Sequence, residues 1–253
     1  MEYIHLDSVE STNDYARSLL AKKKTDSGII VVSADEQTKG RGQRGNSWES
    51  EKGKNLTFSM LCYPVWVSAS KQFVLSQSIA LAIFDVLFDT DKAYASKYYK
   101  SSGFSVKWPN DIYYGDKKIS GTLIECDLCG KSISNCIIGS GVNVNQKEFK
   151  SDAPNPISLF QIYKREFELE KLLRDVCERF KENLEMIRRG YSAEIKQRYF
   201  NNLYRRDGFY RYKDKDGEFM ARIKDVEDNG VLLLEREDRE VKRYEFKEVA
   251  FLI

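Results

Sequence analysis

Apolar residues in the first third of the chain change between helical and strand-like spacing. The Ser-Thr-Asn-Asp stretch at 11–14 offers a capping hydroxyl and a carboxylate three positions on, and the apolar spacing after it predicts a helix over residues 12–24. Residues 28–32 and 55–63 have the apolar pattern of strands. Residues 73–88 keep apolar positions three and four apart over a length that no strand reaches, so we expect a second helix that covers a sheet.

The middle of the chain, from Ser105 to Val144, consists of short β-rich runs. Turn residues at Gly115-Asp116 and Gly130 divide them. The runs are 106–108, 112–114, 119–126, 133–138 and 142–144. This succession predicts a meander of antiparallel strands.

The last third predicts a long helix and then a small β domain. An apolar stripe from Leu169 to Ile187 ends in two arginines and Gly190, which is typical of a helix with a basic last turn and a glycine stop. From about Asp207 the chain has short alternating runs, broken at the hairpin signals Asp216-Gly217 and Asn229-Gly230. We expect an all-β C-terminal domain there, packed closely on the rest because no Pro-rich linker precedes it.

Composition excludes several classes of protein. The 253 residues, 42% of them hydrophobic, can bury a full core. The 41 basic and 39 acidic residues are interspersed and nearly cancel, so charge gives no argument for a nucleic-acid partner. The N-terminus lacks the basic and apolar regions of a signal peptide, and we expect no apolar run near the roughly 20 residues that span a bilayer. These features predict a cytoplasmic protein without a membrane partner.

The cysteines predict reduced thiols rather than a disulfide framework. There are five, an odd number at irregular spacing. Cys126 and Cys129 form a C-x-x-C with Cys136 close by, which raises the alternative of a zinc site. A structural zinc site needs four ligands, and the only histidine is His5, so we interpret the three thiols as a strand end and a hairpin turn and predict no metal site.

The polar segment 37–48 interleaves glycines with cations. These are Gly40, Gly42, Gly45, Lys39, Arg41 and Arg44. Glycines let backbone N–H groups approach a phosphate, and arginines offer planar forks to phosphate oxygens, so the segment predicts an anion-binding loop. A solvated basic turn is the alternative, and the spacing alone leaves both open. The segment matches neither the P-loop nor the dinucleotide-binding pattern.

A second candidate is Lys107, which stands before Trp108-Pro109. Proline fixes its own φ and biases the preceding residue towards extended geometry, so Lys107 should project from a rigid strand end. Taken alone, the stretch favours an ordinary surface lysine, because most lysines are exposed.

Five motifs, in this order, resemble the signatures of biotin protein ligases. They are Ser-Thr-Asn at 11–13, Gly-Arg-Gly-Gln-Arg-Gly at 40–45, Lys-Trp-Pro-Asn-Asp at 107–111, Lys-Ile-Ser-Gly-Thr-Leu-Ile-Glu at 118–125 and Gly-Ser-Gly-Val-Asn-Val-Asn at 139–145. The resemblance implies an α+β fold related to class II aminoacyl-tRNA synthetases, with a mixed, mainly antiparallel sheet flanked by helices. It also implies a small SH3-like C-terminal domain, which agrees with the texture of the sequence. We expect a catalytic domain over residues 1–204 and the SH3-like domain over 205–253.

The same resemblance implies the site residues. Those that would contact biotin are Ser11, Thr12, Asn13, Gln37, Arg41, Gly42, Gln43 and Lys107. Those that would contact ATP or the adenylate are Gly40, Arg44, Trp48, Asn110 and Asn143. Lys107 and Arg41 would be the catalytic pair, because they can offset charge that develops on the phosphate. Trp48 or Trp108 could form a wall for adenine or biotin, although an aromatic residue there is more often part of the core.

Two departures from the family pattern bear on function. The family usually has arginine where this chain has Gln43, which lowers the charge of the loop expected to cover the adenylate. Regulatory members carry a helix-turn-helix domain before the Ser-Thr-Asn motif, whereas ten residues precede it here, so we expect no DNA binding.

The activity that the resemblance implies has two steps. Biotin and ATP, with Mg²⁺, would form biotinyl-5′-AMP, and a lysine of a biotin carboxyl carrier domain of a carboxylase would then take the biotinyl group. Neither step needs a covalent enzyme nucleophile. A monomer and a homodimer both fit. The alternatives are a lipoate-type acyl-adenylate ligase and a regulator that binds biotin without catalysis.

Overall fold

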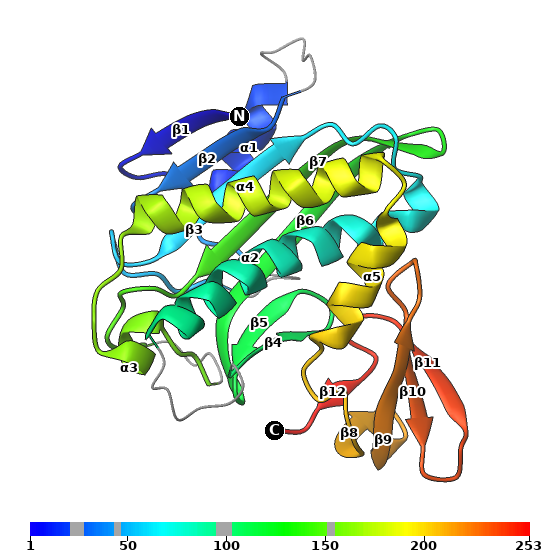
Figure 1. The fold of residues 1–253 in the computed structure, drawn as a ribbon. Coiled ribbons are helices and arrows are strands. Elements are labelled where there is room, and N and C mark those ends of the chain that lie inside the picture. Colours follow the sequence, from blue (N-terminus) through cyan, green and yellow to red (C-terminus); the bar gives the residue numbers. More distant parts are fainter. Residues whose placement is uncertain (21–27, 43–46, 95–102, 151–154) are drawn as a thin grey trace.

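The computed structural model describes residues 1–20, 28–42, 47–94, 103–150 and 155–253 and contains two sheets (Figure 1). The strand order is β1-β2-β3-β7-β6-β5-β4 in the large sheet and β11-β10-β9-β8-β12 in the small one. Only the β1–β2 pair is parallel among these described strands. The predicted mixed, mainly antiparallel sheet and the additional C-terminal sheet are therefore confirmed.

The large sheet comprises β1 (Glu2–Leu6), β2 (Ile30–Ala34), β3 (Leu56–Cys62), β4 (Phe104–Lys107), β5 (Asp111–Tyr114), β6 (Lys117–Cys129) and β7 (Ser132–Val142). The helices are α1 (Thr12–Leu20), α2 (Phe73–Tyr94), α3 (Leu159–Tyr163), α4 (Leu169–Arg188) and α5 (Ser192–Asn201), with a short 3₁₀ turn at Ala69–Lys71. The small sheet comprises β8 (Tyr210–Asp214), β9 (Gly217–Val226), β10 (Leu232–Arg236), β11 (Val241–Tyr244) and β12 (Ala250–Phe251).

Helices cover both faces of the large sheet. On β3, Met60 faces the core beneath α2 and α4, whereas its neighbour Leu61 faces a smaller core beneath α1. This alternation follows from the two-residue period of a strand and explains why β3 is buried along its whole length. Figure 1 shows α2 and α4 side by side on one face and α1 behind the sheet on the other.

Helix α2 is longer than predicted and corrects one expectation. The segment Ala69–Tyr94 is long and apolar enough to cross a membrane, so the expectation that no apolar run approaches this length is wrong. In its most apolar window 78% of the segment is buried inside the protein. It packs against the sheet, α4 and α5, and this burial on several sides explains its apolar composition.

The remaining helices and strands agree with the sequence prediction only in part. The runs 133–138 and 142–144 are not two strands, because β7 runs unbroken to Val142 through Gly139 and Gly141. Helix α4 matches the predicted stripe, and Gly190 after it has the expected positive φ of 94°. Helix α1 is described as far as Leu20, and the rest of the predicted 12–24 span lies outside the described residues. Strand β1 and helix α5 were not predicted.

The small sheet packs against the β4–β5 end of the large one. The indole Nε1 of Trp108 donates to the carbonyl oxygen of Gly230 at 2.9 Å, and the rings of Trp108 and Phe246 lie 5.9 Å apart. Arg205 reaches across to the carbonyl oxygen of Leu252 at 2.8 Å. The boundary between residues 204 and 205 stays a prediction, but the two sheets share a continuous apolar core.

Candidate active site

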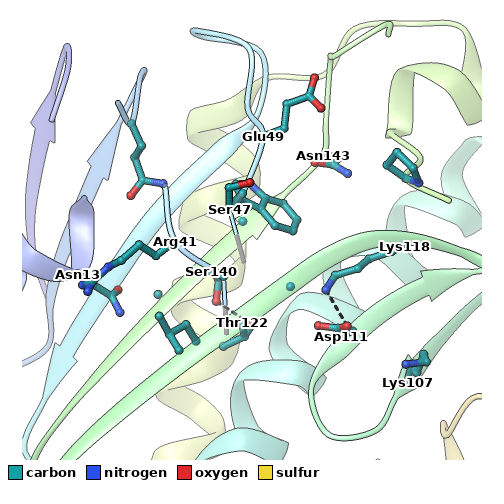
Figure 2. Close-up of a pocket in the computed structure, with 18 of the residues that line it drawn as sticks. Asn13, Arg41, Ser47, Glu49, Lys107, Asp111, Lys118, Thr122, Ser140 and Asn143 are labelled. Carbon is teal, nitrogen blue, oxygen red and sulfur yellow. Dashed lines mark hydrogen bonds and ion pairs between the residues drawn. The ribbon is translucent and has the colours of Figure 1, made fainter. Parts of the chain in front are cut away.

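A cavity of about 810 Å³ opens over the β6–β7 hairpin, and both sheets contribute to its wall (Figure 2). Its lining comes from the start of α1, the 37–49 segment, the β4–β5 turn, β6, β7 and the Phe246–Lys247 turn of the small sheet. Most of the residues predicted to bind biotin or nucleotide meet here, although up to 132 positions separate them along the chain: Ser11, Thr12, Asn13, Gln37, Arg41, Gly42, Trp48, Lys107 and Asn143.

Glycines on β7 form a flat floor. A Cβ atom on Gly139 would overlap Oδ1 of Asn13, and one on Gly141 would overlap the indole ring of Trp48. Only glycine permits such close approach, which gives the Gly-Ser-Gly motif a steric cause. It also explains why these positions looked like a break between two strands in the sequence.

One end of the cavity is a buried hydrogen-bond network at the start of α1. Thr12 donates through its backbone N and through Oγ1 to Oε1 of Gln37, at 2.8 and 3.0 Å. Ser59 Oγ lies 2.7 Å from Thr12 Oγ1 and 2.6 Å from Asn13 Oδ1. The side chains of Thr12, Asn13 and Ser59 belong to residues that are at most 5% exposed.

This network has fewer hydrogens than contacts. The backbone N–H of Thr12 identifies the partner atom of Gln37 as the carbonyl oxygen, and the amide oxygen of Asn13 is likewise an acceptor. The hydroxyls of Thr12 and Ser59 therefore supply two hydrogens to three oxygen–oxygen contacts. A ligand that brings N–H or O–H donors matches this end of the cavity better than one that brings only acceptors.

The other end carries cations. Lys118 lies 2.7 Å from Oδ2 of Asp111, whereas Arg41 lies beside Asn13, as Figure 2 shows, and forms an ion pair with Asp14 of α1. Lys107, the last residue of β4, has no ion-pair partner among the described residues. Its Nζ instead lies 4.8 Å from the ring centre of Phe251 and 5.4 Å from that of Tyr113.

Burial lowers the pKa of the Lys107 ammonium below its ordinary value of 10.5, because the charged form loses water, and the nearby Asp111 carboxylate only partly opposes this. A half-buried ammonium that lies against aromatic rings and has no ion-pair partner among the described residues is well placed to take an anionic ligand.

Not every predicted site residue lines the cavity. Asn110 is buried away from it and donates to Oγ of Ser76 on α2 at 3.0 Å. Gly40 also lies outside the lining, where its carbonyl oxygen accepts from the backbone N of Trp48 at 3.1 Å. Gln43 and Arg44 fall outside the described residues. Trp108 is 4% exposed in the core and also borders the cavity, while its contact with adenine or biotin stays a prediction.

Sequence reasoning missed Lys118, Asp111 and the small-sheet residues Phe246 and Lys247, all of which line the cavity. Lys118 opens one of the five motifs, and the β5–β6 hairpin that brings it to Asp111 was predictable from Gly115-Asp116. No sequence signal pointed to Phe246 or Lys247, because their approach depends on how the two sheets pack.

The cysteines lie elsewhere. Cys126 and Cys136 are paired across β6 and β7 with their sulfur atoms 2.7 Å apart, and Cys129 is exposed near the hairpin turn. In the described part of the chain, the group that could hold a metal ion is His5, Asp7 and Asp35, whose ligand atoms lie within 4.8 Å of one another. It is exposed at the β1 edge and lies outside the cavity lining.

Comparison with known proteins agrees with the five motifs. Residues 5–143 match the biotin/lipoate A/B protein ligase family. The chain is 27% identical over 248 residues to the bifunctional ligase/repressor BirA of Bacillus spizizenii, covering 95% of this chain and 71% of that protein. It is 31% identical over 118 residues to the biotin--[acetyl-CoA-carboxylase] ligase of Paracoccus denitrificans, covering 47% of this chain and 45% of that protein.

Among solved structures, the chain is similar to biotin protein ligase from Aquifex aeolicus in complex with biotin and ATP. The TM-score is 0.75 at 26% identity, and the match covers 98% of this chain and 97% of that one. The fold, the order of the motifs and the relatives agree, so the resemblance to biotin protein ligases is confirmed. The chain belongs to the biotin/lipoate A/B protein ligase family.

Proposed function

We propose that this protein joins biotin to AMP at the expense of ATP and then transfers the biotinyl group to one lysine of a biotin carboxyl carrier domain. The observation that carries the proposal is the division of one cavity into a hydrogen-poor polar end and a cationic end. A bicyclic urea with a carboxylate on a chain has the complementary chemistry at its two ends.

The polar end suits the ureido ring of biotin. That ring has two N–H donors and one carbonyl acceptor, and the Thr12–Ser59–Gln37 network lacks a hydrogen. Burying a polar ring costs free energy unless its polar groups form hydrogen bonds. A network with spare acceptors therefore favours a ligand that carries N–H donors. Ser11, Gly42 and Gln43 would complete the contacts.

The cationic end suits the reacting groups. One oxygen of the biotin carboxylate would attack the α-phosphorus of Mg-ATP in line, the bond to the bridging oxygen would break, and pyrophosphate would leave with the electron pair. Lys107 and Arg41 would offset the charge on the α-phosphate, and Lys118 would join them by exchanging Asp111 for a phosphate oxygen.

The nucleotide would lie on the glycine floor. Trp48 and Asn143 both border the cavity, and each has a buried side-chain atom without a hydrogen-bond partner among the described atoms: Nε1 of Trp48, a donor, and Oδ1 of Asn143, an acceptor. Adenine offers both ring-nitrogen acceptors and an amino donor. Arg44 would contact the phosphates, while Gly40 and Asn110 would act by supporting the loop and the β4–β5 turn. Glu49 and Asp111 are the carboxylates in the lining that suit the Mg²⁺ that accompanies ATP.

In the second step, the lysine amine of the carrier would attack the biotinyl carbonyl, and AMP would leave with the electron pair of the anhydride oxygen. The partner is thus the carrier domain of a biotin-dependent carboxylase. We further propose a cytoplasmic enzyme, monomeric or homodimeric, that binds neither DNA nor membranes.

The direct test is to incubate the protein with ATP, Mg²⁺, biotin and a carboxylase carrier domain, and to detect biotinylated lysine by mass spectrometry. A carrier with its acceptor lysine changed to arginine is the control and should stay unlabelled. Pyrophosphate exchange into ATP discriminates the alternatives. Exchange that depends on lipoate instead of biotin would identify a lipoate-type ligase, and biotin binding without exchange would identify a regulator.

A further inference from the structure

We propose that Glu125, which lies outside the cavity, is a positioning residue that fixes the orientation of the Asn13 carboxamide and so sets the selectivity for the ureido carbonyl of biotin. The inference rests on the proposed function and deepens it. It concerns a side chain that does not itself border the ligand space.

Three neighbouring strands hold the side chain of Asn13. Glu125 on β6 accepts from Nδ2 at 3.0 Å, and Ser59 on β3 donates to Oδ1 at 2.6 Å. Gly139 on β7 lies directly beneath, so close that a Cβ there would overlap the carboxamide. Asn13 is 5% exposed, and its amide plane is therefore fixed on every side except the cavity.

Glu125 determines which of its two possible orientations the Asn13 carboxamide adopts. A rotation of about 180° around the last side-chain bond of an asparagine exchanges the amide oxygen and nitrogen with almost no change in shape. Ser59 could bind either atom, because a hydroxyl both donates and accepts. An ionised carboxylate only accepts, so Nδ2 must face Glu125 and Oδ1 must face Ser59. The second hydrogen of Nδ2 then remains as a donor for a ligand carbonyl.

Glu125 is itself held in place. Arg17 on α1 lies 3.7 Å from Oε2 of Glu125 and 3.7 Å from Oδ2 of Asp127. The Arg17 pair keeps the carboxylate beside Asn13, while Asp127 shares the arginine without reaching the carboxamide. Asp127 therefore offers a matched control on the same strand.

The experiment compares biotin with 2-iminobiotin, in which an imino group replaces the ureido oxygen, by biotin-dependent pyrophosphate exchange into ATP. Wild-type protein should favour biotin, because at neutral pH the imino group of the analogue is protonated and so offers the Asn13 N–H no acceptor. Glu125→Ala frees the amide to turn over, so we expect the KM for biotin to rise about tenfold and the preference for biotin to narrow by a similar factor, with the KM for ATP unchanged.

Glu125→Gln should keep most of the preference, because its amide oxygen still accepts from Nδ2. Asp127→Ala should keep all of it. Adding Glu125→Ala to Asn13→Ala should cause no further loss, because the two act through one contact.

A wild-type protein that shows no biotin-dependent exchange would refute the proposed function. A wild-type protein that is active, with Glu125→Ala folded by circular dichroism and the preference for biotin over iminobiotin unchanged, would refute the positioning role alone. An equal loss in Asp127→Ala would also refute it, because the effect would then come from Arg17. If Glu125→Ala does not fold, Glu125→Gln becomes the deciding variant, and loss of the preference for biotin in that variant refutes the role.

Discussion

Nζ of Lys107 lies 4.8 Å from the ring centre of Phe251, although the first residue ends a strand of the large sheet and the second belongs to the last strand of the small one. A cation over an aromatic face is stabilised by about 0.5–2 kcal/mol. The small sheet thus holds a group of the candidate site in place, in addition to packing on the large sheet.

Replacing Phe251 with leucine should therefore slow adenylation more than it lowers stability. Leucine keeps the apolar contacts with the small-sheet core but removes the aromatic face. We expect a roughly two- to thirtyfold loss in pyrophosphate exchange. Phe209→Leu, an exposed ring of the small sheet, is the control. Equal losses in both variants would mean that Phe251 only packs.

The lowered pKa of Lys107 predicts opposite effects of alkaline pH on activity and on stability. Activity needs the charged ammonium, so kcat/KM for biotin should fall as pH rises through a value below 10.5. Stability should rise over the same interval, because the native state releases its proton before the unfolded state does. Lys107→Arg keeps its charge at high pH and should move the fall in activity to higher pH. An unchanged alkaline limb in Lys107→Arg would assign that limb to another group.

Lys107 and Lys118 should both matter for the first step. Lys107→Ala and Lys118→Ala each remove a donor near the developing charge, and we expect single-turnover adenylation to fall by about 100- to 1000-fold in each. Asp111→Asn should instead raise the KM for ATP, because it leaves Lys118 in place but removes a carboxylate that suits Mg²⁺. Wild-type adenylation in Lys107→Ala, with normal biotin binding, would exclude Lys107 from catalysis.

The glycine floor predicts a selective defect in nucleotide binding. A methyl group at Gly141 would displace the indole of Trp48, so Gly141→Ala should raise the KM for ATP while biotin binding in the absence of ATP, measured by calorimetry, stays close to normal. Ser134→Ala, near the exposed start of β7, is the control. Loss of biotin binding in Gly141→Ala would show that the floor serves both ligands.

The sequence predicted the elements with strong periodicity and missed those whose formation depends on packing. The stripe of α4 and its glycine stop are local signals, so both were correctly predicted. Helix α5 is secured by Ile195 and Tyr199, which are buried against distant elements, and its own pattern is weak. Strand β1 is a short edge strand with three exposed residues among five, so it lacks a clear apolar face.

The candidate site shows the same difference between residues marked by a local motif and residues placed by long-range packing. Residues inside compact motifs, such as Thr12 and Lys107, were identified, whereas Ser59 and Phe246 could not be, because a cross-sheet contact leaves no trace in spacing. Asn110 shows the converse. It stands inside a motif, but its side chain supports α2 and does not border the cavity.

The burial of α2 has a consequence for synthesis of the chain. One side of α2 packs against α4, and Asn183 of α4, 105 positions later in the chain, donates to the carbonyl oxygen of Ser78 in α2 at 3.0 Å. A ribosome that has reached residue 168 has therefore made an apolar helix without its cover. Until α4 emerges from the ribosome, α2 is a long, uncovered apolar segment, which is the kind of segment that membrane-insertion machinery and chaperones bind.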